Sequence, residues 1–120
     1  EIHSYQIEGL GKNLIPSTLL FDKVDQFIRV NDEMSAYTTR EVALKEAIMG
    51  GYTTGAVVQA LKQYANSHSL TEDDIIVLIF PDHGSRYITK VYSDDWMMEQ
   101  GFVNNCVHNY EEHFKTEYIK

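Results

Sequence analysis

The six residues at 75–80, IIVLIF, constrain the fold of this chain more than any other stretch. Every position is apolar, whereas a strand with one face in solvent alternates apolar and polar residues. The run is the longest apolar run in the chain, yet it is far shorter than the roughly 20 apolar residues that span a membrane. It therefore predicts a strand buried on both faces, as in the sheet of an α/β protein, and no membrane segment.

Two helical patterns precede this run. Residues over about 33–47 carry apolar side chains on one helical face, with Thr39, Arg40 and Lys45 on the far side. The clearest helix follows Gly55, where apolar residues recur at i, i+3, i+4, i+7 and i+8. The residues that define the two apolar faces are Met34, Tyr37, Leu44, Ala47 and Ile48 in the first helix, and Val57, Ala60, Leu61, Tyr64 and Ala65 in the second.

Shorter elements complete the pattern. Residues 3–8 alternate as in a strand, residues 20–28 recur as in a short helix, and short helices are expected around 86–92 and 95–100. Ser93 and Asp94 precede the last of these and can cap it. Strands and helices alternate along the chain, which favours a layered α/β sheet.

Composition narrows the classes of partner and compartment. The 120 residues suffice for one small domain. The net charge is −8, and the ten Lys and Arg residues are scattered, which argues against nucleic-acid binding. The single cysteine, Cys106, allows no internal disulfide and suits a reducing cytosol. Because the chain starts with Glu1 and not Met, we expect that more chain once preceded it.

Three glycine-containing loops, at 8–11, 50–55 and 81–84, are the candidate ligand site. Each follows an expected strand or precedes an expected helix, and ligands of open α/β sheets bind where strands end. In the second loop, glycines let the backbone approach a flat ring or an anion, and two Thr hydroxyls can bond a heteroatom. The commoner role for Thr53 or Thr54 is that of a helix N-cap, and we favour it from the local pattern alone.

Other candidate residues have simpler structural roles. Asp82 and His83 could form an acid–base pair, but a turn is the favoured interpretation. Cys106 and His108 are too few for a metal site, which needs three or four ligands, so no metal is expected. The side chains of 96–98 favour core packing over a cofactor site. These parts assemble no set of nucleophile, base and orienting group.

Three motifs, in this order, resemble fold-type II pyridoxal-phosphate (PLP) enzymes of the cystathionine β-synthase and cysteine synthase family. They are YQIEGLGKNLIP at 5–16, EAIMGGYTTG at 46–55, and IIVLIFPD at 75–82 followed by RYITK at 86–90. The stretch SDDWM at 93–97 is more similar to the cystathionine β-synthase branch. The resemblance covers about residues 4–102, which is most of the chain.

The resemblance implies a fold and an activity. The fold would be part of the larger, carboxyl-terminal three-layer domain of a tryptophan synthase β-like enzyme, a mostly parallel sheet flanked by helices. Residues 1–103 would belong to this domain, and 104–120 would form a helical tail or linker. The parent enzyme would join serine and homocysteine into cystathionine, in the cytoplasm and as a homo-oligomer, with a dimer favoured. Alternatives are a cysteine synthase that uses O-acetylserine, and a non-catalytic, self-associating module.

The resemblance also assigns site residues. Thr53 takes the place of the family's serine, whose hydroxyl faces the pyridine nitrogen of PLP. The family's Schiff-base lysine and phosphate-binding loop have no counterpart in this sequence, so the chain alone carries no catalytic residue and is expected to be inactive. Tyr52 departs from the small residue that is common in the family. The remaining residues that would line the active site are Glu8, Gly9, Gly11, Gly51, Pro81 and Asp82.

Overall fold

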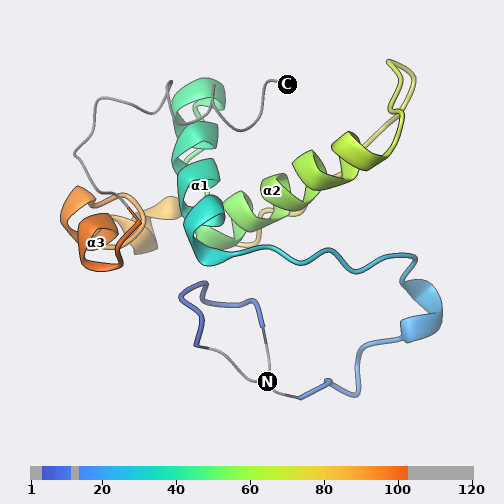
Figure 1. Cartoon of the computed structure of the whole chain (residues 1–120), viewed down its shortest axis with the longest axis horizontal. Helices are drawn as coiled ribbons and strands as arrows, with labels where there is room; N and C mark the ends of the chain where they lie inside the picture. Colours follow the sequence, from blue (N-terminus) through green and yellow to red (C-terminus); the bar gives the residue numbers. More distant parts are fainter. Residues whose placement is uncertain (1–3, 12–13, 103–120) are drawn as a thin grey trace.

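The computed structural model describes residues 4–11 and 14–102. Their architecture is helical, and Figure 1 shows helices α1 and α2 meeting near their amino ends while α3 lies on the other side of α1. The helices and 3-10 turns in chain order are η1 (Phe21–Lys23), α1 (Asp32–Glu46), α2 (Tyr52–Ser67), η2 (Gly84–Tyr87) and α3 (Asp94–Glu99).

The predicted α/β fold with a mostly parallel sheet is wrong for this structure. Within the described residues no sheet forms, and β-type pairing is limited to one antiparallel bridge between Gly50 and His83. Residues 75–80 are extended but unpaired, and Ile75, Val77 and Ile79 are 91%, 82% and 75% exposed. The described part of the amino-terminal stretch, 4–8, forms no strand either. An apolar run reports a tendency to be buried, whereas a strand also requires a partner for its backbone groups.

Helix α1 forms where its pattern predicted it. The side chain of Asn31 caps its start by accepting a hydrogen bond of 2.8 Å from the Met34 amide. Asp32 and Glu33 in the first turn suit the positive end of the helix dipole. The helix ends at Ala47, which takes up a left-handed conformation with φ of 55°. Local capping and periodicity therefore account for both ends of α1.

The buried face of α1 differs from the predicted apolar face. Leu44 is 72% exposed, whereas Thr39 and Arg40, expected on the far side, are buried. The reason is the close approach of α2 at Gly55, where an added Cβ would lie 1.9 Å from the Ser35 carbonyl oxygen. Small side chains permit this contact, so side-chain size decided which face is buried and hydrophobicity did not.

Polar interactions join α1 to α2 inside this contact. Thr38 donates a hydrogen bond of 3.2 Å to the Gln59 side chain, and both residues are buried. Glu41 pairs with Lys62 of α2 and, at 2.9 Å, with Lys45. Burial raises the pKa of Glu41, but the hydrogen bonds and charges of the two lysines outweigh burial and hold that pKa below its ordinary value.

Helix α2 forms as predicted, and α3 begins with the predicted Ser93 cap. The expected helix at 20–28 is wrong, because only η1 forms and an extended segment follows it. Of the helix expected around 86–92, η2 covers the first residues and turns follow. Met97 is fully buried, so the core interpretation of 96–98 is confirmed there. The buried core consists of Ile7, Ala36, Tyr37, Tyr52, Ala56, Tyr87, Val91 and Met97.

No helix in the described stretches 4–11 and 14–102 is long and apolar enough to cross a membrane. Cys106, His108 and the tail expected at 104–120 lie outside these stretches. Among the described residues, no three His, Cys, Asp or Glu side chains are grouped to hold a metal ion.

Candidate functional site

The amino end of α2 brings the first and second candidate loops together. Gly51 occupies the N-cap position without a side-chain cap, so the N-cap interpretation of Thr53 or Thr54 is wrong. Thr53 lies in the first turn and is partly exposed. Its hydroxyl donates a hydrogen bond of 3.2 Å to the Glu8 carbonyl oxygen. A Cβ added at Gly9 would lie 3.6 Å from the same hydroxyl oxygen. Glu8, Gly9 and Thr53 are therefore neighbours.

Backbone hydrogen bonds join the third loop to the second. The Gly51 amide donates to the Asp82 carbonyl oxygen at 2.9 Å, and the Gly84 amide donates to the Met49 carbonyl oxygen at 2.8 Å. The Tyr92 hydroxyl donates to the Gly50 carbonyl oxygen at 2.7 Å. The start of α2 is thereby fixed to the loop at 81–84.

Asp82 and His83 have separate partners. The Asp82 carboxylate accepts a hydrogen bond of 2.7 Å from the Tyr87 hydroxyl through Oδ2. The His83 ring nitrogen Nδ1 accepts a hydrogen bond of 3.1 Å from the Ser85 amide and caps η2. Burial, together with the hydrogen bond to Asp82, raises the pKa of Tyr87 to about 12. The tyrosine therefore remains a proton donor at neutral pH.

The glycines of the second loop are explained by contacts within the protein. A Cβ at Gly51 would lie 1.9 Å from the Asp82 Oδ1 atom and 2.9 Å from the Tyr87 ring. A Cβ at Gly50 would lie 2.2 Å from the Thr54 hydroxyl oxygen. Within the described part of the chain, Thr54 Oγ1 and Asp82 Oδ1 are buried without a hydrogen-bond partner. At Gly50 and Gly51, the space that a Cβ would take is filled by side chains of the same protein, and these contacts explain the glycines.

Three contact residues near the candidate loops are not among the predicted site residues. Lys90 forms an ion pair with the Glu8 side chain and so connects the segment after η2 to the first loop. The Tyr87 hydroxyl donates to Asp82 of the third loop, and the Tyr92 hydroxyl donates to Gly50 of the second loop. The motif RYITK contains Tyr87 and Lys90. Its pattern reveals neither the partner of Lys90, which lies 82 positions away, nor the hydrogen bond from Tyr87 to Asp82.

The two remaining predicted residues lie at the margin of this cluster. Pro81 is exposed. Gly11 has a φ of 72°, and a Cβ there would lie 3.2 Å from the Tyr5 ring. The Tyr5 hydroxyl donates to the Gly11 carbonyl oxygen and closes the first loop.

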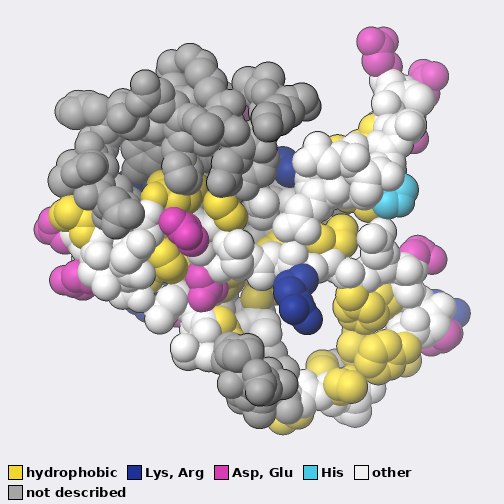
Figure 2. All heavy atoms as spheres, viewed as in Figure 1, with side chains coloured by type: hydrophobic (Ala, Val, Ile, Leu, Met, Phe, Trp, Pro, Cys, Tyr) yellow, Lys and Arg dark blue, Asp and Glu magenta, His cyan; other side chains and the backbone are white. Residues whose placement is uncertain are grey.

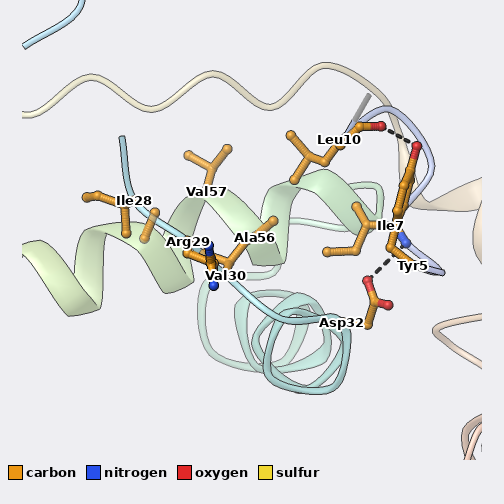
Figure 3. Close-up of a pocket in the computed structure, with 11 residues that line it drawn as sticks. Tyr5, Ile7, Leu10, Ile28, Arg29, Val30, Asp32, Ala56 and Val57 are labelled. Carbon is orange, nitrogen blue, oxygen red and sulfur yellow. Dashed lines mark hydrogen bonds between the residues drawn. The ribbon is translucent and has the colours of Figure 1, made fainter. Parts of the chain in front are cut away.

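An apolar groove of about 400 Å³ lies further along α2. Figure 3 shows Ala56 and Val57 on one side and Ile7 and Leu10 of the amino-terminal segment on another. The Asp32 carboxylate accepts hydrogen bonds from the Gln6 and Ile7 amides at 2.7 and 3.2 Å, which fixes that segment beside α1. Gly11 lines the groove, but Thr53 does not, so the groove and the Thr53 cluster are distinct features.

The residues around Thr53 fit the ring end of PLP. The partly exposed, neutral hydroxyl of Thr53 can bond a ring nitrogen, and the start of α2 that carries it is fixed by several hydrogen bonds. Lys90 is paired with Glu8, and we assign no residue of this chain to the phosphate group or to the Schiff base. The fit is therefore to one end of the cofactor.

Comparisons with known proteins give matches over most of the chain. Cystathionine beta-synthase from Saccharomyces cerevisiae is 34% identical over 108 residues, which are 89% of this chain and 21% of that protein. N-(2-amino-2-carboxyethyl)-L-glutamate synthase from Cupriavidus metallidurans is 32% identical over 93 residues, 77% of this chain and 27% of that protein. The chain thus spans between a fifth and about a quarter of the length of these relatives. No protein-family model matches it.

The class that these matches define is that of synthases from a family that is generally PLP-dependent. Over the matched residues, the chain is similar to cystathionine beta-synthase, and the match supports a relationship at the level of the family. The predicted resemblance is therefore confirmed at the level of the family.

Proposed function

We propose that the complete protein is a PLP-dependent β-replacement enzyme that condenses serine with homocysteine, and that this chain contributes Thr53 as the partner of the cofactor's ring nitrogen. The observation that carries the proposal is the Thr53 hydroxyl, which lies partly exposed in the first turn of α2 beside Glu8 and Gly9. The identity of 34% with a cystathionine beta-synthase supports the choice of reaction.

PLP, when bound, supplies an electron sink for the bonds around the amino-acid α-carbon. The role of Thr53 is to hold the ring nitrogen without protonating it, since a neutral hydroxyl has no charge to stabilise a pyridinium. A hydroxyl donates one hydrogen, and that of Thr53 goes to the Glu8 carbonyl oxygen. An unprotonated ring nitrogen would therefore compete with this carbonyl oxygen for the same hydrogen.

The proposal extends to the whole protein. Its substrates would be amino acids, it would assemble as a homodimer, and it would function in the cytoplasm. The 120-residue chain by itself would be inactive, because the resemblance places the Schiff-base lysine outside it.

A Thr53→Asp variant of the complete protein tests the role of Thr53. A carboxylate beside the ring nitrogen would stabilise its protonated form, with the proton taken from solvent, and would also face the Glu8 carbonyl oxygen. We therefore expect turnover of serine and homocysteine to fall at least about tenfold. The absorbance of the bound cofactor between about 300 and 500 nm should shift. Thr53→Ser, which keeps the hydroxyl, is the matched control and should retain most of the activity. An unchanged spectrum and rate in Thr53→Asp would remove Thr53 from the site.

A cysteine synthase is the second candidate function. The second relative has a different reaction in its name, so members of this family differ in their substrates. Turnover of O-acetylserine and sulfide, measured beside serine and homocysteine on the complete protein, separates the two candidates. A preference for O-acetylserine would replace the first proposal and leave the role of Thr53 intact.

A non-catalytic, self-associating module is a third candidate. The exposed apolar residues at 75–80 favour association of this chain with another surface. Stable binding of PLP and turnover by the complete protein would exclude a purely non-catalytic role.

A further inference from the structure

We propose that Tyr87 and Asp82 form a positioning pair that fixes the Thr53 hydroxyl for the cofactor's ring nitrogen. The inference rests on the proposed function, because it concerns the same ring contact. The resemblance places Asp82 along the active site, but neither Asp82 nor Tyr87 is given a direct contact with the cofactor. Their effect passes through Gly51, where α2 begins.

The pair is connected to α2 by short contacts. The Tyr87 hydroxyl donates to Asp82 Oδ2 at 2.7 Å, and the Asp82 carbonyl oxygen accepts from the Gly51 amide at 2.9 Å. Thr53 follows Gly51 by two residues and lies in the first turn. A displacement of Asp82 would therefore move Gly51, the N-cap residue of α2, and with it the first turn that carries Thr53.

The carboxylate of Asp82 also packs directly against the backbone of α2. A Cβ at Gly51 would lie 1.9 Å from Asp82 Oδ1, and this oxygen is buried. Since Tyr87 is 5% exposed and packs in the core, its ring holds the hydroxyl that donates to Asp82 in a fixed position. The carboxylate is thus held between the core and the start of α2.

The Tyr87 hydroxyl is the partner that orients this carboxylate. Without it, Asp82 Oδ2 would lose the hydrogen bond of 2.7 Å, while Oδ1 is already buried without a partner in the part of the chain that the structure describes. A half-buried carboxylate with neither oxygen paired is costly, so its side chain would turn toward water. The third loop would then shift and displace the start of α2.

A double-mutant cycle on the complete protein tests the proposal. The variants are Tyr87→Phe, Thr53→Ala and the combination of both, and the measurement is the Kd for PLP, obtained by absorbance titration of the cofactor-free protein. Tyr87→Phe alone should weaken PLP binding about fivefold to tenfold. Because Tyr87 acts through Thr53, the double variant should bind PLP within about twofold of Thr53→Ala. Tyr64→Phe, which removes a hydroxyl elsewhere on α2, is the matched control.

Asp82→Asn separates position from charge. Asparagine keeps an oxygen that can accept from Tyr87 but removes the negative charge. If the pair acts by fixing the position of Asp82, the Kd for PLP should stay within about threefold of that of the unsubstituted protein. The cofactor spectrum should not shift. A loss as large as that in Tyr87→Phe would show that charge is responsible and would overturn the positioning role. If Tyr87→Phe does not fold, the Asp82→Asn variant by itself decides whether the positioning role holds.

The outcomes distinguish this inference from the proposed function. If Thr53→Ala leaves the Kd and spectrum unchanged, the ring contact is wrong and both proposals fall. If Thr53→Ala weakens binding but Tyr87→Phe has no effect, or has the same effect with and without Thr53, the proposed function stands and the positioning pair is rejected.

Discussion

At the scale of single residues, the site depends on hydroxyl groups that must keep their protons. The Tyr87 hydroxyl donates to a carboxylate, and the Thr53 hydroxyl donates to a carbonyl oxygen. Tyr52, which departs from the family's small residue, lies away from the solvent and donates to the Asp32 carbonyl oxygen at 2.7 Å. Burial raises the pKa of Tyr52 well above its ordinary value. Its role is therefore structural.

Because of the Tyr87 hydrogen bond, the free energy of unfolding should depend on pH in the alkaline range. The pKa of Tyr87 is raised from 10.0 to about 12, first by burial and then by Asp82. The folded state therefore binds the proton more tightly than the unfolded state, and stability falls between pH 10 and pH 12. Below pH 10, the contribution is fully present.

Urea unfolding at several pH values between 9 and about 12 checks this expectation. The difference in the free energy of unfolding between the unsubstituted protein and Tyr87→Phe should shrink as the pH rises, since the phenylalanine variant lacks this titration. Parallel curves for the two proteins would show that Tyr87 contributes no such dependence. The comparison also removes the contribution of Tyr92, which both proteins contain and whose pKa is raised by burial in this structure.

At the scale of elements, the contact of α1 with α2 is the best-defined packing in the structure. The two helices cross closely at Gly55, and a buried hydrogen bond joins Thr38 of α1 to Gln59 of α2. Figure 1 shows the two helices diverging from this contact. The rest of α2 carries Val57 and Ala60, which line the apolar groove.

Gly55→Ala should destabilise the protein even though alanine favours helices. The new Cβ would lie 1.9 Å from the Ser35 carbonyl oxygen, which belongs to the backbone and cannot rotate away. Overpacking should lower the free energy of unfolding by about 1–3 kcal/mol or more, which exceeds the gain of about 1 kcal/mol from the higher helix propensity of alanine. Chemical denaturation measures the difference, and Asn66→Ala on the exposed surface of α2 is the control. A stabilised Gly55→Ala protein would contradict the observed crossing.

Helices α1, α2 and α3 could be predicted from the sequence, but the helix expected at 20–28 does not form, and the packing of the helices could not be predicted. The periodicity of α2 and the Ser93 cap of α3 are local signals. The burial of Thr39 depends on Gly55, which lies on another helix. Likewise, residues 75–80 carry the pattern of a strand, but pairing depends on a second strand that the pattern does not describe.

The candidate site was predicted in part for the same reason. The motifs identified the loops that meet at the start of α2, including Gly51 and Asp82. They did not identify the Glu8–Lys90 pair, which joins residues 82 positions apart. Nor did they give the direction of the Asp82 side chain, which its hydrogen bond with Tyr87 sets.

At the scale of the whole molecule, the described chain exposes many large apolar side chains. Figure 2 shows hydrophobic side chains gathered over the extended segment that precedes α1. Phe21 and Phe27 of that segment are 53% and 65% exposed. Ile75, Val77 and Ile79 add a second exposed stretch. Surfaces of this kind are usually covered by other protein.

The 120-residue chain should therefore self-associate when it is isolated, because unpaired extended segments with apolar side chains pair with one another. Val77→Lys places a charge in the exposed stretch at 75–80 and should shift the chain toward the monomer. Sedimentation velocity at several concentrations measures the change. Leu44→Lys, at a position of α1 that is 72% exposed, is the matched control and should leave association unchanged. Equal effects of the two substitutions would exclude 75–80 as the contact.

The ion pair between Glu8 and Lys90 has a consequence for the order of folding. These residues are 82 positions apart, whereas the Thr38–Gln59 bond in the helical contact joins residues 21 positions apart. Closing a longer loop costs more chain entropy, and a contact at the surface returns less free energy. We expect the helical contact to form early and the Glu8 loop to dock late. By the same reasoning, we expect this loop to open more readily than the helical contact, and its opening would expose Thr53 further to a ligand.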